Sequence, residues 1–179
     1  MAAFTERDKY EHRLDWNILR DGGIALYWRR DFFDDDMLWL RQQDYQVFPF
    51  DCARWASHEE MHADFQRTLG FPDYYGRNLD ALNDCLGDLP VPHVGGIALA
   101  LTRFDAYAKG QGADLAGSGR AEAEIVLDLL ARASRFFLLT GRRLLTLVQT
   151  DDPRIGFELL GCISATWNHR EWLNKNRGL

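Results

Sequence analysis

Short apolar segments separated by helix-forming stretches constrain the fold of this chain more than any other feature of its sequence. Strands that alternate with helices are joined by crossover connections, which is typical of a largely parallel sheet. The sequence therefore predicts an α/β domain in which helices pack against a small parallel sheet. Four segments have the length and apolar character of such strands: Ile-Ala-Leu-Tyr-Trp at 24–28, Gln-Val-Phe-Pro-Phe at 46–50, Gly-Gly-Ile-Ala-Leu-Ala-Leu-Thr at 95–102 and Leu-Leu-Thr-Leu-Val-Gln at 144–149.

Helix signals lie between and around these segments. Three aspartates at 34–36 precede an apolar stretch, where acidic residues favour a helix start. Ser57 and Glu60 form a capping box ahead of a helix through Leu69, whose buried stripe is expected to contain Met61 and Phe65. A longer helix is expected at 122–137, with one apolar face made of Ile125, Leu129, Leu130, Ala133 and Phe136.

The remaining segments give weaker signals. Pro49 predicts that the strand at 46–50 is irregular or ends early. Residues 109–119 are rich in glycine and are expected to form a loop. The last part of the chain favours an edge strand at 158–167 and a short helix at 169–175.

Composition excludes several classes of protein. The 179 residues carry a net charge of −6, which argues against a surface that binds nucleic acid, because such a surface needs a basic stripe. No apolar run approaches the ~20 residues that span a bilayer, and the charged N-terminus lacks the apolar core of a signal peptide. The three cysteines, Cys52, Cys85 and Cys162, form no Cys-x-x-Cys motif. We therefore expect a cytoplasmic protein.

A literal His-Glu-x-x-His pattern occurs at residues 58–62. In zinc proteases this pattern places two histidines one turn apart on a helix to bind the metal, and the glutamate activates water. His58 directly follows the expected N-cap residue Ser57, so it falls in the first turn, and no third histidine follows. The pattern therefore favours ordinary surface histidines over a zinc-dependent hydrolase that uses His58, Glu59 and His62, and no metal or cofactor is expected.

A second candidate site lies between Phe71 and Pro90, where a turn leads into a short amphipathic helix. Asn78 is a good N-cap, and Asp80 and Asp84 lie one turn apart on the polar side with Asn83. Like charges at this spacing repel by ~0.2–0.5 kcal/mol. The opposite side of the helix is apolar and contains Leu79, Leu82, Cys85 and Leu86. The segment has a net charge of −3, from Asp73, Asp80, Asp84 and Asp88 against Arg77.

Three hypotheses account for these carboxylates. They belong to a solvated surface, or they form a protein-binding face in which Tyr74 and Tyr75 are exposed aromatic anchors beside charge-assisted hydrogen-bond acceptors. The third hypothesis is a pair of catalytic acids, which would need a concave site that makes their pKa values differ. The residues alone favour the first two hypotheses over catalysis.

Residues 72–86, Pro-Asp-Tyr-Tyr-Gly-Arg-Asn-Leu-Asp-Ala-Leu-Asn-Asp-Cys-Leu, resemble the signature of the barstar family, intracellular inhibitors of the ribonuclease barnase. The order of the expected elements agrees with that family from about residue 45 to residue 150. The resemblance implies a non-enzymatic protein that occludes the active site of a basic microbial ribonuclease or related toxin. It assigns the partner contacts to Tyr74, Tyr75, Gly76, Asn78, Asp80, Asn83, Asp84 and Gly87.

The resemblance also implies individual roles and shows departures. Tyr74 would pack on the catalytic histidine of the nuclease, Asp84 would mimic the scissile phosphate, and Asp80 would pair with an arginine at the rim. Asn83 and Leu89 stand at or near positions where the family prototype has tryptophan, and Arg132 stands where it has an acidic residue. These departures favour a partner other than barnase. They leave open a barstar-fold interaction or immunity module for a partner that is not a ribonuclease.

The chain extends beyond the resemblance on both sides. Residues 1–44 are expected to add a strand and a helix, and residues 151–179 a strand and a helix. We expect both extensions to form one compact unit with the barstar-like part at 45–150.

Overall fold

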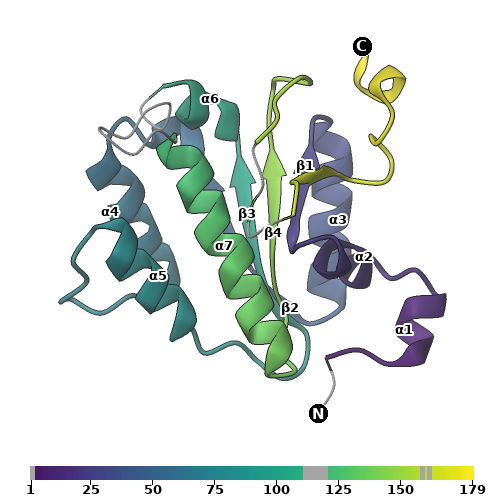
Figure 1. Ribbon diagram of the computed structural model, residues 1–179, viewed down its shortest axis with the longest axis horizontal. Coiled ribbons are helices and arrows are strands. Elements are labelled where there is room, and N and C mark those ends of the chain that lie inside the picture. Colours follow the sequence, from purple (N-terminus) through teal and green to yellow (C-terminus); the bar gives the residue numbers. More distant parts are fainter. Residues whose placement is uncertain (1–2, 111–120, 158–159, 161–162) are drawn as a thin grey trace.

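A parallel sheet organises the chain, as the alternation of strands and helices predicts. The computed structural model describes residues 3–110, 121–157, 160 and 163–179. Over these residues the sheet has five strands in the order β2-β3-β4-β1-β5, and each neighbouring pair is parallel (Figure 1). The strands are β1 (Ile24–Tyr27), β2 (Tyr45–Asp51), β3 (Gly96–Thr102), β4 (Leu144–Gln149) and β5 (Thr166–Trp167).

Helices cover both faces of this sheet. The described helices are α1 (Glu6–Tyr10), α2 (Leu14–Arg20), α3 (Arg30–Gln42), α4 (His58–Leu69), α5 (Leu79–Gly87), α6 (Phe104–Lys109) and α7 (Glu122–Leu139), with 3₁₀ turns at Cys52–Arg54 and Asn174–Arg177. One face packs against α4, α5 and α7, and the other against α2 and α3. Among the described residues, no helix has the length and apolar character that crossing a membrane requires.

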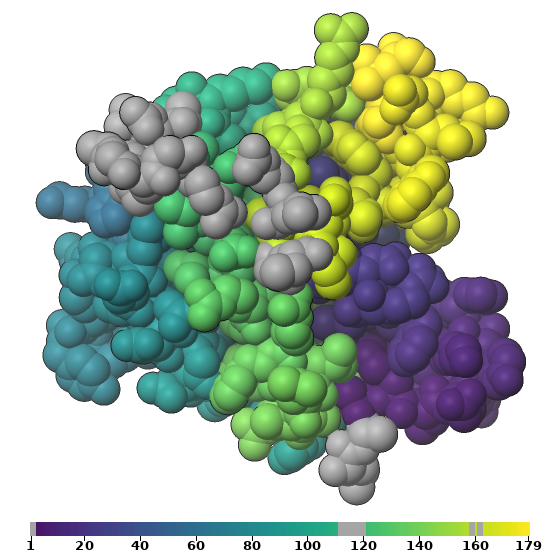
Figure 2. Space-filling model, viewed as in Figure 1, coloured from purple at the N-terminus to yellow at the C-terminus, as the bar shows by residue number. Residues whose placement is uncertain are grey.

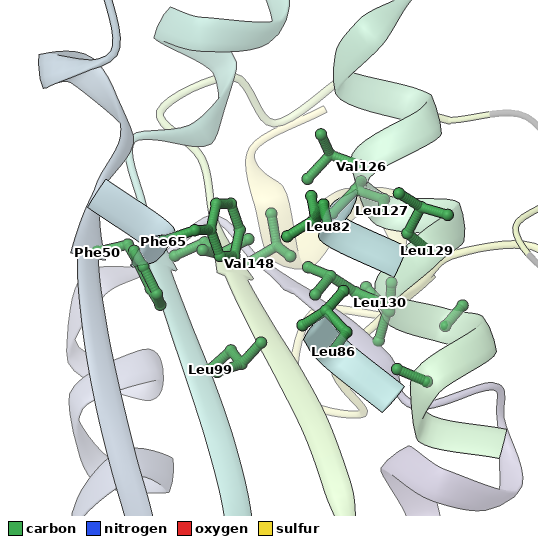
Figure 3. Close-up of a cluster of buried hydrophobic side chains, with 14 of the residues drawn as sticks. Phe50, Phe65, Leu82, Leu86, Leu99, Val126, Leu127, Leu129, Leu130 and Val148 are labelled. Carbon is green, nitrogen blue, oxygen red and sulfur yellow. The ribbon is translucent and has the colours of Figure 1, made fainter. Parts of the chain in front are cut away.

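The two faces of the sheet bury separate apolar clusters, because side chains along a strand point alternately to opposite sides. In β4, Leu144 and Val148 join the cluster under α4, α5 and α7, whereas Leu145 and Leu147 join the cluster under α2 and α3. Figure 3 shows the first cluster, in which Leu82 and Leu86 of α5 meet side chains of α7. The sheet is therefore the middle layer of three, and α5 is anchored through its apolar side.

Most of the expected elements are confirmed, including Ser57 as the N-cap of α4 and Asn78 as the N-cap of α5. The expectation for Pro49 was wrong, because β2 continues to Asp51. Since β2 is an edge strand, its proline removes no hydrogen bond that the interior of the sheet needs. The helix expected after Asp34 begins earlier, at Arg30, so that Phe33 can enter the core beside Tyr27.

Two further expectations need correction. Phe136 does not join the buried face of α7, because the burial shifts to the neighbouring Phe137 and leaves Phe136 half exposed. The C-terminal strand is short, and residues 169–173 do not form the expected helix. That segment is fixed instead by Arg177, whose guanidinium donates to the carbonyls of Glu171 and Trp172. The expected loop at 111–119 and parts of the expected strand, 158–159 and 161–162, lie outside the described residues.

Candidate protein-binding surface

Helix α5 holds the acidic residues in a fixed orientation. The side chain of Asn78 accepts a hydrogen bond of 2.8 Å from the backbone N–H of Ala81, which satisfies one of the unpaired donors of the first turn. Leu82 and Leu86 are fully buried and tie the helix to the core, whereas Leu79 and Cys85 are partly buried. The apolar side predicted from the sequence is therefore confirmed, and the opposite side faces outward.

The loop before α5 is braced against α4. Gly70 ends α4 in the left-handed region with φ of 69°, and the side-chain amide of Gln66 donates to the carbonyl of Pro72 at 3.0 Å. The carbonyl oxygen of the Gln66 side chain in turn accepts from the guanidinium of Arg77 at 3.1 and 3.2 Å. Arg77 itself has a positive φ of 47°, which is unusual for a residue with a side chain. The loop therefore has a defined path between the two helices.

The two loop tyrosines have opposite environments, so the expectation of an exposed pair was wrong for one of them. Tyr74 is 88% exposed, whereas Tyr75 is 6% exposed and stacks edge-on against Phe71. The hydroxyl of Tyr75 hydrogen-bonds Nδ1 of His62, and burial raises the pKa of this tyrosine. Tyr74 is therefore the residue of the two that a partner can reach, and Tyr75 supports the loop from beneath.

The carboxylates of Asp80 and Asp84 are exposed. Among the described residues, neither side chain accepts a hydrogen bond or forms an ion pair. Asn83 and Gly87, on the same side of α5, are partly exposed, and Gly76 lies in the loop beside Asn78. The loop and helix thus present one exposed aromatic ring and two unpaired carboxylates from a rigid support.

A groove of about 340 Å³ lies at the surface between α5 and α7, which pack against each other beneath it. In Figure 2 the segments that form it lie next to one another on the same face of the molecule. Asp84 and Arg132 both line it, so the base that departs from the family pattern faces the same hollow as the acid. Its lining is Asn83, Asp84, Gly87, Asp88, Arg132, Ala133 and Phe136. Asp88 and Phe136 were not candidates from the sequence, because the positions of α7 relative to α5 depend on long-range packing.

The His-Glu-x-x-His pattern does not form a surface pair. His62 is fully buried, and burial, followed by the nearby His58 and Arg77, lowers its pKa to about 4. His58 is half exposed, and its Nδ1 contacts the carboxylate of Glu122, a buried residue at the start of α7. His62 stands three residues before the buried Phe65, and this spacing was a signal for its burial. No local signal links His58 to Glu122, since they are 64 positions apart.

Comparison with known proteins gives a family match for more than half of this chain. The family model described as "Barstar (barnase inhibitor)" matches residues 45–149, which include the loop, α5 and most of the sheet. A protein of Bacillus subtilis (strain 168) with the name "Putative ribonuclease inhibitor YrdF" is 61% identical over 36 residues, which make up 18% of this chain and 40% of that protein.

A solved structure also aligns with this chain, the Walker-type ATPase PABY2304 of Pyrococcus abyssi. The identity is 14% and the TM-score 0.43, and the alignment covers 83% of this chain and 45% of that protein. Both matches span less than half the length of the proteins concerned.

Proposed function

This chain belongs to the barstar family, and from that membership we propose that it binds a basic microbial ribonuclease and occludes its active site. The binding surface is the loop at 74–76 together with the acidic side of α5. One observation carries the proposal: Tyr74 is exposed beside two carboxylates that have no partner among the described residues, within the segment that the family model matches.

Electrostatics supports a basic partner. The exposed carboxylates of Asp80 and Asp84 repel one another. Asp80 lies in the first turn of α5, where the helix dipole favours an anion, but Asp84 lies toward the C-terminal end, where the dipole disfavours one. Arginines and lysines around the active site of a ribonuclease, which bind phosphates, would reverse this cost. In such a complex each carboxylate would receive charge-assisted hydrogen bonds. The exposed ring of Tyr74 would supply apolar contact at the centre.

The test is a calorimetric titration against a panel of basic microbial ribonucleases that are catalytically disabled. We expect one-to-one binding that weakens between low and physiological salt. In the proposed complex, Asp84→Ala leaves a buried arginine or lysine of the ribonuclease without its ion-pair partner. This change is expected to cost ~3–5 kcal/mol of binding free energy. Its free energy of unfolding should stay unchanged or rise slightly, because an anion near the helix C-terminus is removed.

Glu6→Ala is the matched control. It removes one exposed negative charge from α1, outside the family match and away from α5, so the net charge changes equally in both variants. Affinity that is the same in Asp84→Ala and Glu6→Ala would contradict the proposed surface.

A second candidate function follows from Arg132, which places a cation in the groove that Asp84 lines. A cation there repels a basic target and attracts a partner with an acidic group. The same fold would then act as an interaction or immunity module for a partner that is not a ribonuclease. Arg132→Glu separates the two functions, since it should strengthen binding to a basic ribonuclease and weaken binding to a partner that contacts Arg132 through an acid.

A further inference from the structure

Three side chains of types that bind metal ions meet beneath the loop that carries Tyr74 and Tyr75. His58 and His62 lie on successive turns of α4, and Glu122 is the first residue of α7. One ligand atom from each residue lies within 4.8 Å of those of the other two, and the two imidazole rings are 4.2 Å apart between centroids. The pattern singled out in the sequence therefore gains a third donor, from a distant part of the chain.

One ring nitrogen of His62 is left without a partner among the described residues. Its Nδ1 is hydrogen-bonded to the hydroxyl of Tyr75, whereas its Nε2 is buried and has no partner among the described residues. A buried polar atom without a partner is uncommon in native proteins and costs free energy. In the tautomer whose Nδ1–H donates to the hydroxyl of Tyr75, the buried imidazole keeps a lone pair on Nε2, which is then available as a metal ligand.

Each of the three side chains also has a partner that would orient it toward an ion. Nε2 of His58 lies 3.1 Å from the backbone carbonyl of Arg77, and the second carboxylate oxygen of Glu122 accepts from the hydroxyl of Tyr107 at 2.9 Å. Histidines that bind metals ordinarily donate their other ring N–H to an oxygen in this way. The outer contacts of a metal site are thus already present.

We propose that His58, His62 and Glu122 form a site for a divalent transition metal ion of the zinc class, with water as a fourth ligand. Two imidazole nitrogens and one carboxylate oxygen are a donor set typical of zinc. The three ligand atoms, all within 4.8 Å of one another, are close enough to approach the ~3.4 Å separation of tetrahedral ligands with bonds of ~2.1 Å. The 39% exposure of the His58 side chain provides an entry path for the ion.

Three protein ligands and a water are the pattern of catalytic zinc sites, but the cluster lacks the acid that would activate the water, so we assign the ion a structural role. Glu59, the acid of the His-Glu-x-x-His pattern, is exposed and does not belong to the cluster. Two of the ligands contact the loop, His62 through Tyr75 and His58 through the Arg77 carbonyl. Occupancy of the site therefore fixes the loop that presents Tyr74. The site does not depend on the identity of any partner protein, and it is tested without one.

The experiment uses the full chain without a histidine tag, stripped with EDTA and titrated with Zn²⁺ in a calorimeter. We expect one ion per chain, a thermal midpoint raised by several degrees, and slower hydrogen exchange of the backbone amides at 73–78. Co²⁺ in place of Zn²⁺ should give the visible absorption of a tetrahedral site. His58→Ala and Glu122→Gln should each weaken Zn²⁺ binding at least ~100-fold, and Tyr107→Phe about tenfold.

His93→Ala is the matched control, since it removes an exposed histidine outside the cluster and should bind Zn²⁺ like the unaltered protein. Circular dichroism of the metal-free variants separates a lost ligand from a lost fold, and His58, being half exposed, is the ligand whose removal disturbs packing least. Absence of binding to the unaltered chain, or binding that His58→Ala and Glu122→Gln leave intact while both variants are folded, would overturn the site.

Discussion

At the scale of single residues, the adjacent tyrosines Tyr74 and Tyr75 have opposite environments, and we propose that Tyr74 contacts the partner whereas Tyr75 supports the loop. Tyr74→Ala removes a side chain that is 88% exposed, so the free energy of unfolding should change by less than ~0.5 kcal/mol. Ribonuclease binding should weaken by ~2 kcal/mol or more, since an exposed central aromatic is a typical hot spot. Urea unfolding and calorimetric titration measure the two effects separately.

Tyr75→Phe should give the opposite pattern. It removes the hydroxyl that hydrogen-bonds the buried Nδ1 of His62, which should cost ~1–3 kcal/mol of folding free energy and affect binding less than Tyr74→Ala. A Tyr75→Phe variant with unchanged stability and lost affinity would show that Tyr75, and not Tyr74, makes the partner contact.

The sequence did not distinguish Tyr74 from Tyr75, because a loop has no periodicity that separates buried from exposed positions. The burial of His62 contradicts the expectation of a surface histidine, although its spacing of three residues to Phe65 on α4 was a signal for it.

At the scale of elements, the N-cap of α5 sets the position of the acidic side. Asn78→Ala removes the acceptor for the Ala81 N–H and should cost ~1 kcal/mol of folding free energy. Asn78→Ser keeps a side-chain oxygen at the cap and should recover most of this loss. Denaturant unfolding gives the free energies, and exchange of the α5 amides locates the change. Equal stability of all three proteins would show that the packing of Leu82 and Leu86 alone fixes the helix.

Caps and periodicity also explain which elements were predictable. The helices at α4, α5 and α7 have caps or apolar stripes that act over a few residues, and these were found from the sequence. The helices α1 and α2 have five and seven residues, too few for an apolar period to be recognised. The buried Asp15 in α2 obscures the pattern further, since its carboxylate is satisfied by the distant hydroxyl of Tyr45 and by Arg13.

At the scale of the whole molecule, the segments outside the family match complete the sheet. β1 pairs with β4 from Ile24 to Tyr27, and α2 and α3 cover the second apolar cluster. The C-terminal segment attaches through Glu171, whose carboxylate accepts from the backbone N–H groups of Trp28 and Arg29 at 3.1 and 2.8 Å. The strand order follows from such long-range contacts, for which the sequence carries no local signal. We propose from these contacts that the three segments fold as one unit.

A fragment limited to residues 45–149 tests this unit. The fragment leaves β4 as an uncovered edge strand and exposes the face that includes Ala98, Ala100, Leu145 and Leu147. An exposed edge beside an apolar face favours association between chains. We therefore expect no cooperative unfolding transition from the fragment, strong binding of an apolar dye, and aggregation at concentrations where the full chain stays monodisperse. Deletion of residues 1–12 is the control, because it removes α1, which has no buried residue, and from the second apolar cluster only the partly buried Phe4, and it should retain a cooperative transition. A fragment that unfolds cooperatively with the stability of the full chain would show that the matched region folds alone, and the extensions would then need a separate function.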